Sequence, residues 1–398
     1  MNLYALLQVF NDGFKLCSAF LCSFIITYFS IPIIVRVSEE KNLFALPNAR
    51  TSHKHATPTL GGIAMFASVL VTSLLFVDSN DVHNFQYVIA GSFIIFFFGI
   101  KDDLMPLSWK KKIFGEVVAA FFLIVMADFR ITDLHGILGI HQISYLSSTI
   151  LTFFVMVGIV NAMNLIDGID GLAAGLSLMA TCIFGVWFFL TGQVALTILS
   201  ISAVGMLLAY LGFNVFGTTN KIFMGDTGSL LLGYLMTVFV IVMNRQNIAV
   251  ESPWYINNAP VVSFGILFIP LFDTLRVMTI RLMKGKSPFT ADRNHIHHRI
   301  LRLGFTHIQT TLILLLTNGF FILLVFMMQN VEIHLLILLV FSLGIIKSLI
   351  PAYVRRLWLA RTPKIVLTFK NEKIKVHQSI EHNDVRIKIK PLSWVDNN

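Results

Sequence analysis

Long runs of residues without charge recur along almost the whole sequence, and this feature most constrains the fold. A helix of about 20 residues crosses the hydrocarbon core of a bilayer. We count eleven such runs, at roughly 14–37, 59–77, 86–100, 112–128, 144–163, 172–190, 194–214, 228–243, 259–281, 309–328 and 333–351. Only 13% of the 398 residues are charged, whereas soluble domains carry about a quarter. Because no alternating barrel-strand pattern appears, we predict an all-α polytopic membrane protein.

The charges between these runs predict which side of the membrane each loop faces. The odd-numbered loops and the C-terminal tail hold most of the Lys and Arg residues, whereas the even-numbered loops hold only Arg130 and Arg245. Basic loops stay in the cytoplasm, so the odd loops should be cytoplasmic and the N-terminus external. The net charge of +9 then describes a cytoplasmic face that attracts anionic lipid. No motif for nucleic acid accompanies it.

The end of the chain differs from the rest. KIVLTF is rich in β-branched residues and VRIKIK alternates apolar with basic residues, which favours short strands. We therefore predict a multi-helix membrane domain over 1–352 and a short, basic cytoplasmic tail over 353–398, for which β structure is plausible.

A polar stripe, NAMNLIDGIDGLAAG (161–175), interrupts the apolar sequence. Asn161, Asn164, Asp167 and Asp170 are three residues apart, which places them along one face of a helix end. Their oxygen atoms suit a hard cation such as Mg²⁺, which binds a few carboxylates together with substrate phosphates. A polar capping loop would explain one Asn and one Asp, but not four residues in register.

Two further motifs place carboxylates in the odd loops. In GIKDDLMPLSWKKK (99–112), Asp102 and Asp103 repel each other unless a cation or a proton lies between them. The lysines that follow could bind phosphate or anchor the loop at the membrane surface. In FMGDTGS (223–229), Asp226 lies at the start of a predicted helix, whose free N–H groups favour an anion. An ordinary helix-capping Asp is the alternative.

The segment DRNHIHHRI (292–300) combines three histidines with Arg293 and Arg299. Imidazole and guanidinium groups together more often bind phosphate or a sugar phosphate than zinc. No Cys residue or HExxH pattern supports zinc. A solvated basic loop is the remaining alternative.

These four motifs, in this order and on loops of predicted cytoplasmic location, resemble the polyprenyl-phosphate N-acetylhexosamine-1-phosphate transferases, glycosyltransferase family 4. PNARTSHKHATPTLGG (47–62) resembles the first cytoplasmic loop of that family, although Leu46 stands where Asp is frequent. The resemblance covers about 36–305. Since HIHH replaces three consecutive histidines, the chain is similar to the WecA/TagO branch rather than to the phospho-MurNAc-pentapeptide transferases.

The resemblance implies a membrane enzyme that needs Mg²⁺, with Mn²⁺ as a substitute. Its reaction would transfer HexNAc-1-phosphate, foremost GlcNAc-1-phosphate, from a UDP-sugar to undecaprenyl phosphate and release UMP. This step would start an O-antigen, enterobacterial common antigen, capsule or teichoic-type polymer at the cytoplasmic face of the bacterial inner membrane. The expected partners are UDP-HexNAc, undecaprenyl phosphate and membrane lipid, without nucleic acid, and the assembly we consider is a homodimer.

The resemblance also implies roles for individual residues. The expected metal ligands are Asp226 and Asn164. The expected catalytic residues are four carboxylates and three imidazoles: Asp102, Asp103, Asp167, Asp170, His295, His297 and His298. The expected substrate-binding residues come from all the motif loops: Lys54, Lys110, Asn161, Asn214, Phe223 and Arg293.

Within these sets the resemblance suggests a division of labour. Asp102 would steer or deprotonate the lipid phosphate, and Asp103 would support the metal site or Lys110. Asp167 and Asp170 would hold the nucleotide or the waters of the ion. Phe223 would stack on uracil and Asn214 would contact its edge. The imidazoles and Arg293 would bind the diphosphate or the sugar.

Three alternatives remain from the sequence. The first is the phospho-MurNAc-pentapeptide transferase of the same family. The second is an ion-coupled transporter, which would need ionisable residues at mid-membrane and paired repeats. The third is a membrane aspartyl protease, which would need a metal-free Asp dyad.

Overall fold

The computed structural model describes residues 3–45, 57–78, 85–247, 253–287, 294–361, 364–370, 373–377 and 386–389. The chain divides into two units, 1–341 and 342–398. The predicted boundary after residue 352 lies inside a continuous helix, α13 (Ile333–Arg361). Each unit is described by itself below.

Seven helices in the described part of the chain are long and apolar enough to cross a membrane. They are α1 (Leu3–Glu40), α5 (Tyr145–Ile166), α6 (Leu172–Leu190), α7 (Val194–Phe216), α8 (Gly225–Gln246), α12 (His307–Met327) and α13. A bent pair, α9 (Ala259–Ile266) and α10 (Phe268–Met283), makes an eighth if it counts as one span.

The predicted count of eleven spans is therefore not confirmed. The three remaining segments are helical but too short or too polar at one end: α2 (Gly61–Phe76), α3 (Phe85–Leu104) and α4 (Trp109–Ala120), which continues as the π-helix η1 (Phe121–Met126). The charged end of α3 and the basic start of α4 carry motif residues. These charged motif residues therefore shorten the apolar part of α3 and α4.

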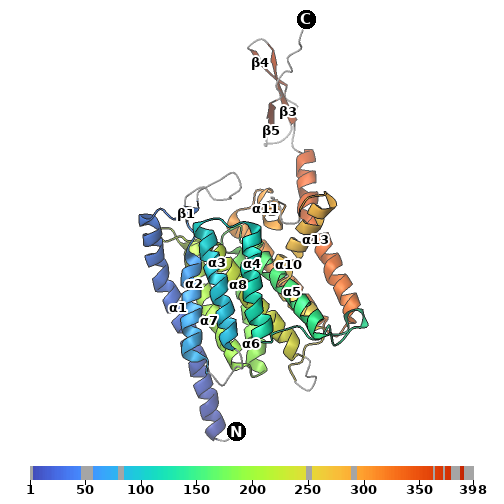
Figure 1. The fold of residues 1–398 in the computed structure, drawn as a ribbon. Helices are drawn as coiled ribbons and strands as arrows, with labels where there is room; N and C mark the ends of the chain where they lie inside the picture. The colour runs from blue at the N-terminus through green and yellow to red at the C-terminus, as the bar shows by residue number, and fades with distance from the viewer. Residues whose placement is uncertain are drawn as a thin grey trace. The chain divides into compact units, whose positions relative to one another are not determined.

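The helix α8 forms the centre of the first unit (Figure 1). Of its apolar span, 94% is buried, and it packs against α2, α3, α5, α6 and α9. A helix that is apolar all round is typical of a protein core or a membrane span, and contacts with five neighbouring helices set the position of α8. Since α8 starts at Gly225, the FMGDTGS motif lies where several helix ends meet.

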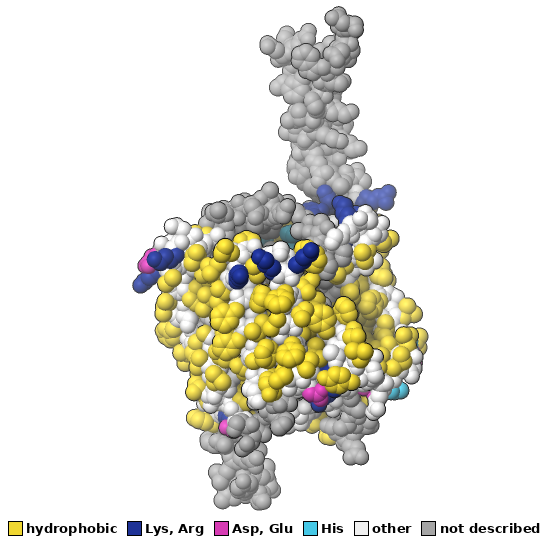
Figure 2. Space-filling model, in the orientation of Figure 1, with side chains coloured by type: hydrophobic (Ala, Val, Ile, Leu, Met, Phe, Trp, Pro, Cys, Tyr) yellow, Lys and Arg dark blue, Asp and Glu magenta, His cyan; other side chains and the backbone are white. Residues whose placement is uncertain are grey.

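The outer surface of the first unit is an apolar belt. Figure 2 shows hydrophobic side chains over the middle of the visible face and Lys and Arg side chains along one rim, over the upper ends of α3 and α4. Exposed large residues such as Phe29, Phe154 and Leu316 belong to this surface. Such a continuous apolar surface suits contact with lipid hydrocarbon.

The bend between α9 and α10 is 88° and falls at Leu267. A break inside a membrane frees backbone groups that need new partners. The buried Asn318 of α12 supplies them: its Oδ1 accepts from Ile269 N at 3.0 Å, and its Nδ2 donates to Ile266 O at 3.0 Å. One side chain therefore stabilises the bend from which α10 runs to the motif residues.

The other elements are short. In the first unit, β1 (Phe44–Ala45) pairs with β2 (Thr57–Pro58), and η2 (Ile137–Gly139) and α11 (Ile296–Leu301) are single turns. In the second unit, β3 (Lys364–Lys370) pairs antiparallel with β4 (Lys373–His377) and parallel with β5 (Arg386–Ile389). The strands expected from KIVLTF and VRIKIK are thus present.

Candidate active site

Side chains from the ends of α3, α4, α5 and α8 meet around Asp226. Its Oδ1 accepts a hydrogen bond from Asn164 Nδ2 at 2.6 Å, and its Oδ2 accepts one from Lys112 Nζ at 2.9 Å. Lys112 also forms an ion pair with Asp102, whose side chain is 3% exposed. The Lys112 ammonium therefore lies between two carboxylates that are distant in sequence. Lys112 was only one of three lysines in its motif, and its spacing alone did not distinguish it.

Asp103 caps α8. Its carboxylate accepts hydrogen bonds from Asp226 N at 2.7 Å, Thr227 N at 3.0 Å and Thr227 Oγ1 at 2.5 Å. Gly225 makes this approach possible, since it has a φ of +67° and a Cβ there would meet both Asp103 carboxylate oxygens. The anion expected at this helix start is therefore a carboxylate of the protein itself, and these N–H groups are already engaged.

Asn164 combines two roles. Besides Asp226, its Nδ2 donates to Ser229 Oγ at 2.9 Å. The amide nitrogen, rather than the oxygen expected as a metal ligand, thus faces Asp226. Its Oδ1 accepts no hydrogen bond from the described residues, so that this oxygen remains a potential ligand beside the carboxylate it orients.

Asn161 leads to a residue that the motif analysis missed. Its Nδ2 lies 3.0 Å from both carboxylate oxygens of Glu116 and also donates to Val157 O. Glu116 belongs to α4 and is 2% exposed. An acidic residue inside the predicted apolar run 112–128 could have revealed it, because buried ionisable groups in membrane proteins are functional candidates.

The loop between α5 and α6 is fastened at its far end. Asp170 forms an ion pair with Lys221 at 2.7 Å, and His307 Nδ1 lies 3.5 Å from the same carboxylate oxygen. The buried Asn214 accepts from Gly171 N at 2.7 Å and donates to Ile222 O at 2.9 Å. The Asn214 amide, expected at the edge of uracil, therefore joins two loops of the protein.

The four carboxylates Asp102, Asp103, Asp167 and Asp226 (the carboxylate cluster) carry more negative charge than Lys112 balances. Burial, together with the negative charges of Asp226, Asp103 and Asp170, raises the pKa of Asp167 from 3.8 to about 8. A site that holds a carboxyl group protonated near neutral pH lacks positive charge. A divalent cation would supply it.

The donor set fits such a cation without enclosing it. Among the described residues, no three His, Cys, Asp or Glu side chains converge to form a closed metal site. Mg²⁺ is usually held by one or two carboxylates and by substrate phosphates. Asp226, Asp102 and the Asn164 oxygen match that pattern, since all three offer the oxygen ligands that this cation prefers.

The histidine motif is anchored by Asp273, to which the sequence analysis gave no role. Its carboxylate lies 2.9 Å from His295 Nδ1, accepts from Ile296 N at 3.1 Å, and pairs with Arg276 at 2.6 Å. His295 is itself buried. His295 was one of the three imidazoles expected to bind substrate. In the structure, its contact with Asp273 holds α11 on α10.

His297 connects the histidine motif with the α5–α6 loop. It is 1% exposed, and a Cβ on Gly168 would collide with its ring. Neither ring nitrogen has a hydrogen-bond partner among the described residues. Burial lowers the pKa of His297 from 6.5 to about 3, so the ring is neutral. His298 is half-buried beside it, with ring centroids 4.2 Å apart.

Two of the remaining expected residues lie outside the described part of the chain, and the structure places the other two. Lys54 and Arg293 are outside the described residues. Lys110 is exposed and lies 5.7 Å from the ring centre of Trp109. The half-buried Phe223 is held through its backbone, which pairs with Pro58 O and Gly61 N.

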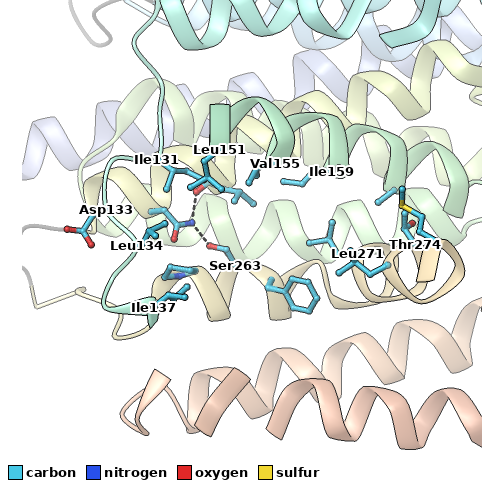
Figure 3. Close-up of a pocket in the computed structure, with 18 residues that line it drawn as sticks. Ile131, Asp133, Leu134, Ile137, Leu151, Val155, Ile159, Ser263, Leu271 and Thr274 are labelled. Atoms are coloured by element: carbon cyan, nitrogen blue, oxygen red, sulfur yellow. Dashed lines mark hydrogen bonds between the residues drawn. The ribbon is translucent and has the colours of Figure 1, made fainter. Parts of the chain in front are cut away.

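An apolar groove of about 350 Å³ lies between α5, α8, α9 and α10. Figure 3 shows Leu151, Val155 and Ile159 of α5 along one side and Leu271 and Thr274 of α10 near one end. The groove also touches Ala162, next to Asn161, and Thr274, next to Asp273. The groove therefore lies between helices that also carry Asn161 and Asp273.

Comparison with known proteins agrees with the motifs. The family model described as "Glycosyl transferase family 4" matches residues 85–244. An undecaprenyl-phosphate alpha-N-acetylglucosaminyl 1-phosphate transferase of Yersinia pestis is 31% identical over 284 residues, 71% of this chain and 75% of its own length. A probable undecaprenyl-phosphate N-acetylglucosaminyl 1-phosphate transferase of Bacillus subtilis is 31% identical over 341 residues, 84% of this chain and 91% of its own.

The chain belongs to glycosyl transferase family 4. The match over 85–244 contains the whole carboxylate cluster and ends before the histidine motif. With its apolar helices, this family member is a multi-pass protein of the bacterial inner membrane. The transporter and the MurNAc-pentapeptide alternatives are not favoured by these relatives.

Proposed function

We propose that this family 4 member transfers GlcNAc-1-phosphate from UDP-GlcNAc to undecaprenyl phosphate and releases UMP. The observation that carries the proposal is that α5 both lines an apolar groove and ends at Asp167 of the carboxylate cluster, which is short of positive charge. This pairing brings a polar diphosphate and a membrane lipid to one place. The names of the relatives from Yersinia pestis and Bacillus subtilis support the same donor sugar and acceptor.

Asp226 is the principal ligand for Mg²⁺ in this proposal, with Asn164 contributing its free oxygen and Mn²⁺ as a substitute. The cation would neutralise the diphosphate as the bond between its β-phosphorus and the bridging oxygen breaks and that oxygen leaves with UMP, since such reactions depend mainly on positioning and charge stabilisation. Asp102 is nearly buried and paired with Lys112. We therefore give Asp102 the role of holding positive charge beside Asp226 rather than that of a base.

The acceptor needs little help with deprotonation. The second pKa of a phosphate monoester is about 6, so the lipid phosphate is largely ionised near neutral pH. The protein then has to hold the nucleophile in line with the diphosphate. The α5–α6 loop with Asp167 and Asp170, and the histidine motif packed on Gly168, border the place where the donor would bind.

The groove is the proposed site for the acceptor chain. Its lining is mostly apolar, and the Nδ2 group of the polar residue Asn244 donates to Val240 O and Ser263 Oγ. A polyprenyl chain could lie there with its phosphate toward the motif residues. The cytoplasmic location of the site, the homodimer and the choice among O-antigen, capsule and teichoic-type polymers stay predictions.

The test is a transfer assay with purified protein in lipid nanodiscs. Sugar-labelled UDP-GlcNAc and undecaprenyl phosphate are incubated with Mg²⁺ or with EDTA, beside the Asp226→Asn variant. We expect Mg²⁺-dependent lipid labelling with stoichiometric UMP, lost in the variant. Labelling only from UDP-GalNAc or UDP-MurNAc-pentapeptide would overturn the donor. Folded protein that labels lipid from none of the three would overturn the reaction.

A further inference from the structure

We propose that Lys112 and the divalent cation compete for the carboxylates Asp102 and Asp226, and that Glu116 receives the Lys112 ammonium when the cation takes its place. This inference rests on the proposed function, because the cation belongs to that reaction. It assigns Lys112 and Glu116 the role of positioning residues that control metal binding.

The position of the ammonium carries the first step. Lys112 Nζ lies 2.9 Å from Asp226 Oδ2 and forms its other ion pair with Asp102. Oxygens of these two carboxylates are the anionic ligands that the cation would use. Two positive charges on the same oxygens repel each other, so the cation has to displace the ammonium in order to bind.

Glu116 offers the displaced ammonium a destination. It lies four residues after Lys112 on α4, which places both side chains on the same face of the helix. Lys112 is 27% exposed and has a flexible four-carbon stem. It can therefore turn along the helix without a change in the backbone.

Glu116 is suited to this role because hydrogen bonds hold its carboxylate in place and no Lys or Arg side chain of the described residues forms a salt bridge with it. Asn161 holds both of its oxygens at 3.0 Å, and it is 2% exposed. Within the part of the chain that the structure describes, Glu116 takes part in no salt bridge. A buried carboxylate without a cation is costly, so an arriving ammonium would stabilise it.

The competition predicts opposite effects of two substitutions on metal affinity. Lys112→Met removes the competitor and should tighten binding about tenfold, which is 1.4 kcal/mol. Glu116→Gln keeps an oxygen for Asn161 but removes the negative charge, and should weaken binding several-fold. In the Lys112→Met background, Glu116→Gln should have no effect, because no ammonium remains to be received.

The experiment measures Mn²⁺ binding to metal-free protein in nanodiscs by the EPR signal of free Mn²⁺, without nucleotide or lipid phosphate. Lys111→Met is the matched control, since it removes one exposed charge from the same helix, and its affinity should equal that of the wild type. Lys112→Gln replaces Lys112→Met if the latter does not fold, as judged by melting in EDTA.

Unchanged or weaker Mn²⁺ binding by the Lys112 variant would overturn the competition. An equal effect of Glu116→Gln in both backgrounds would overturn the role of Glu116. The transfer assay is independent of this result. If Lys112→Met binds Mn²⁺ more tightly while the wild type transfers no sugar phosphate, the competition stands and the proposed reaction fails.

Discussion

Replacing Asp103 by Ala should destabilise the protein through the start of α8. The substitution removes the acceptor of three hydrogen bonds, from Asp226 N, Thr227 N and Thr227 Oγ1. Loss of a helix cap costs about 0.5–2 kcal/mol. The Thr227 hydroxyl is fully buried, and a buried donor without a partner costs a further ~1–3 kcal/mol. We therefore expect a loss of about 1.5–5 kcal/mol.

The assay is thermal unfolding in nanodiscs with EDTA, so that metal binding does not contribute. About 2–4 °C per kcal/mol is typical of domains of 150–250 residues, which predicts a fall in the midpoint of at least ~3 °C. Asp103→Asn keeps one acceptor oxygen and should lose about half as much. A variant that melts like the wild type but is inactive would refute the capping role and favour a direct contact of Asp103 with metal or substrate.

Three further substitutions test other parts of the structure. Gly225→Ala should destabilise the protein, because a Cβ at a φ of +67° would collide with Thr59 O and lie 2.5 Å from the Asp103 carboxylate; the double variant with Asp103→Ala should melt below Asp103→Ala alone, because the Thr59 contact and the backbone strain remain. His297 has a pKa of about 3 when folded and 6.5 when unfolded, so its contribution to stability is complete above pH 6.5 and falls by up to ~1.4 kcal/mol per pH unit below it. Denaturant titrations of His297→Phe should therefore show a shallower acid slope, and an unchanged slope would refute its burial as the neutral form. Gly158→Phe should raise the apparent KM for undecaprenyl phosphate about tenfold while the KM for UDP-GlcNAc stays constant, since Gly158 lines the groove and has open space beside it. Gly212→Phe, in open space away from the groove lining, is its control, and equal KM values in the two variants would contradict the groove as the acceptor site.

Sequence patterns predicted the helical membrane fold well, because apolar length is read directly along the chain. The number of spans was less predictable. Helices α2, α3 and α4 read as apolar runs, but each is short or charged at one end. The 88° bend at Leu267 was also missed, since nothing local marks it. It depends on Asn318, about 50 residues later in the sequence.

The motifs named loops that meet in the fold, but not the partners within them. The three-residue spacing drew attention to Asn164, and the fold places Asp226 within hydrogen-bond distance of it. The partner of Asn161 is Glu116, a residue outside every motif. Asp103 engages the N–H groups at the start of α8 that were expected to bind a ligand anion. Such pairings depend on how helix ends meet in space, which a single sequence does not record.

The most direct measurement of the central claim follows two labels in one UDP-GlcNAc molecule, ³H in the sugar and ³²P in the β-phosphate. Purified protein, Mg²⁺ and undecaprenyl phosphate are combined, and lipid and water-soluble products are separated. Our account predicts that both labels enter the lipid in equal amounts and that unlabelled UMP is released. If the sugar enters the lipid while ³²P stays with the nucleotide as UDP, the bond that breaks is the glycosidic one, and transfer of a sugar phosphate at the carboxylate cluster is contradicted.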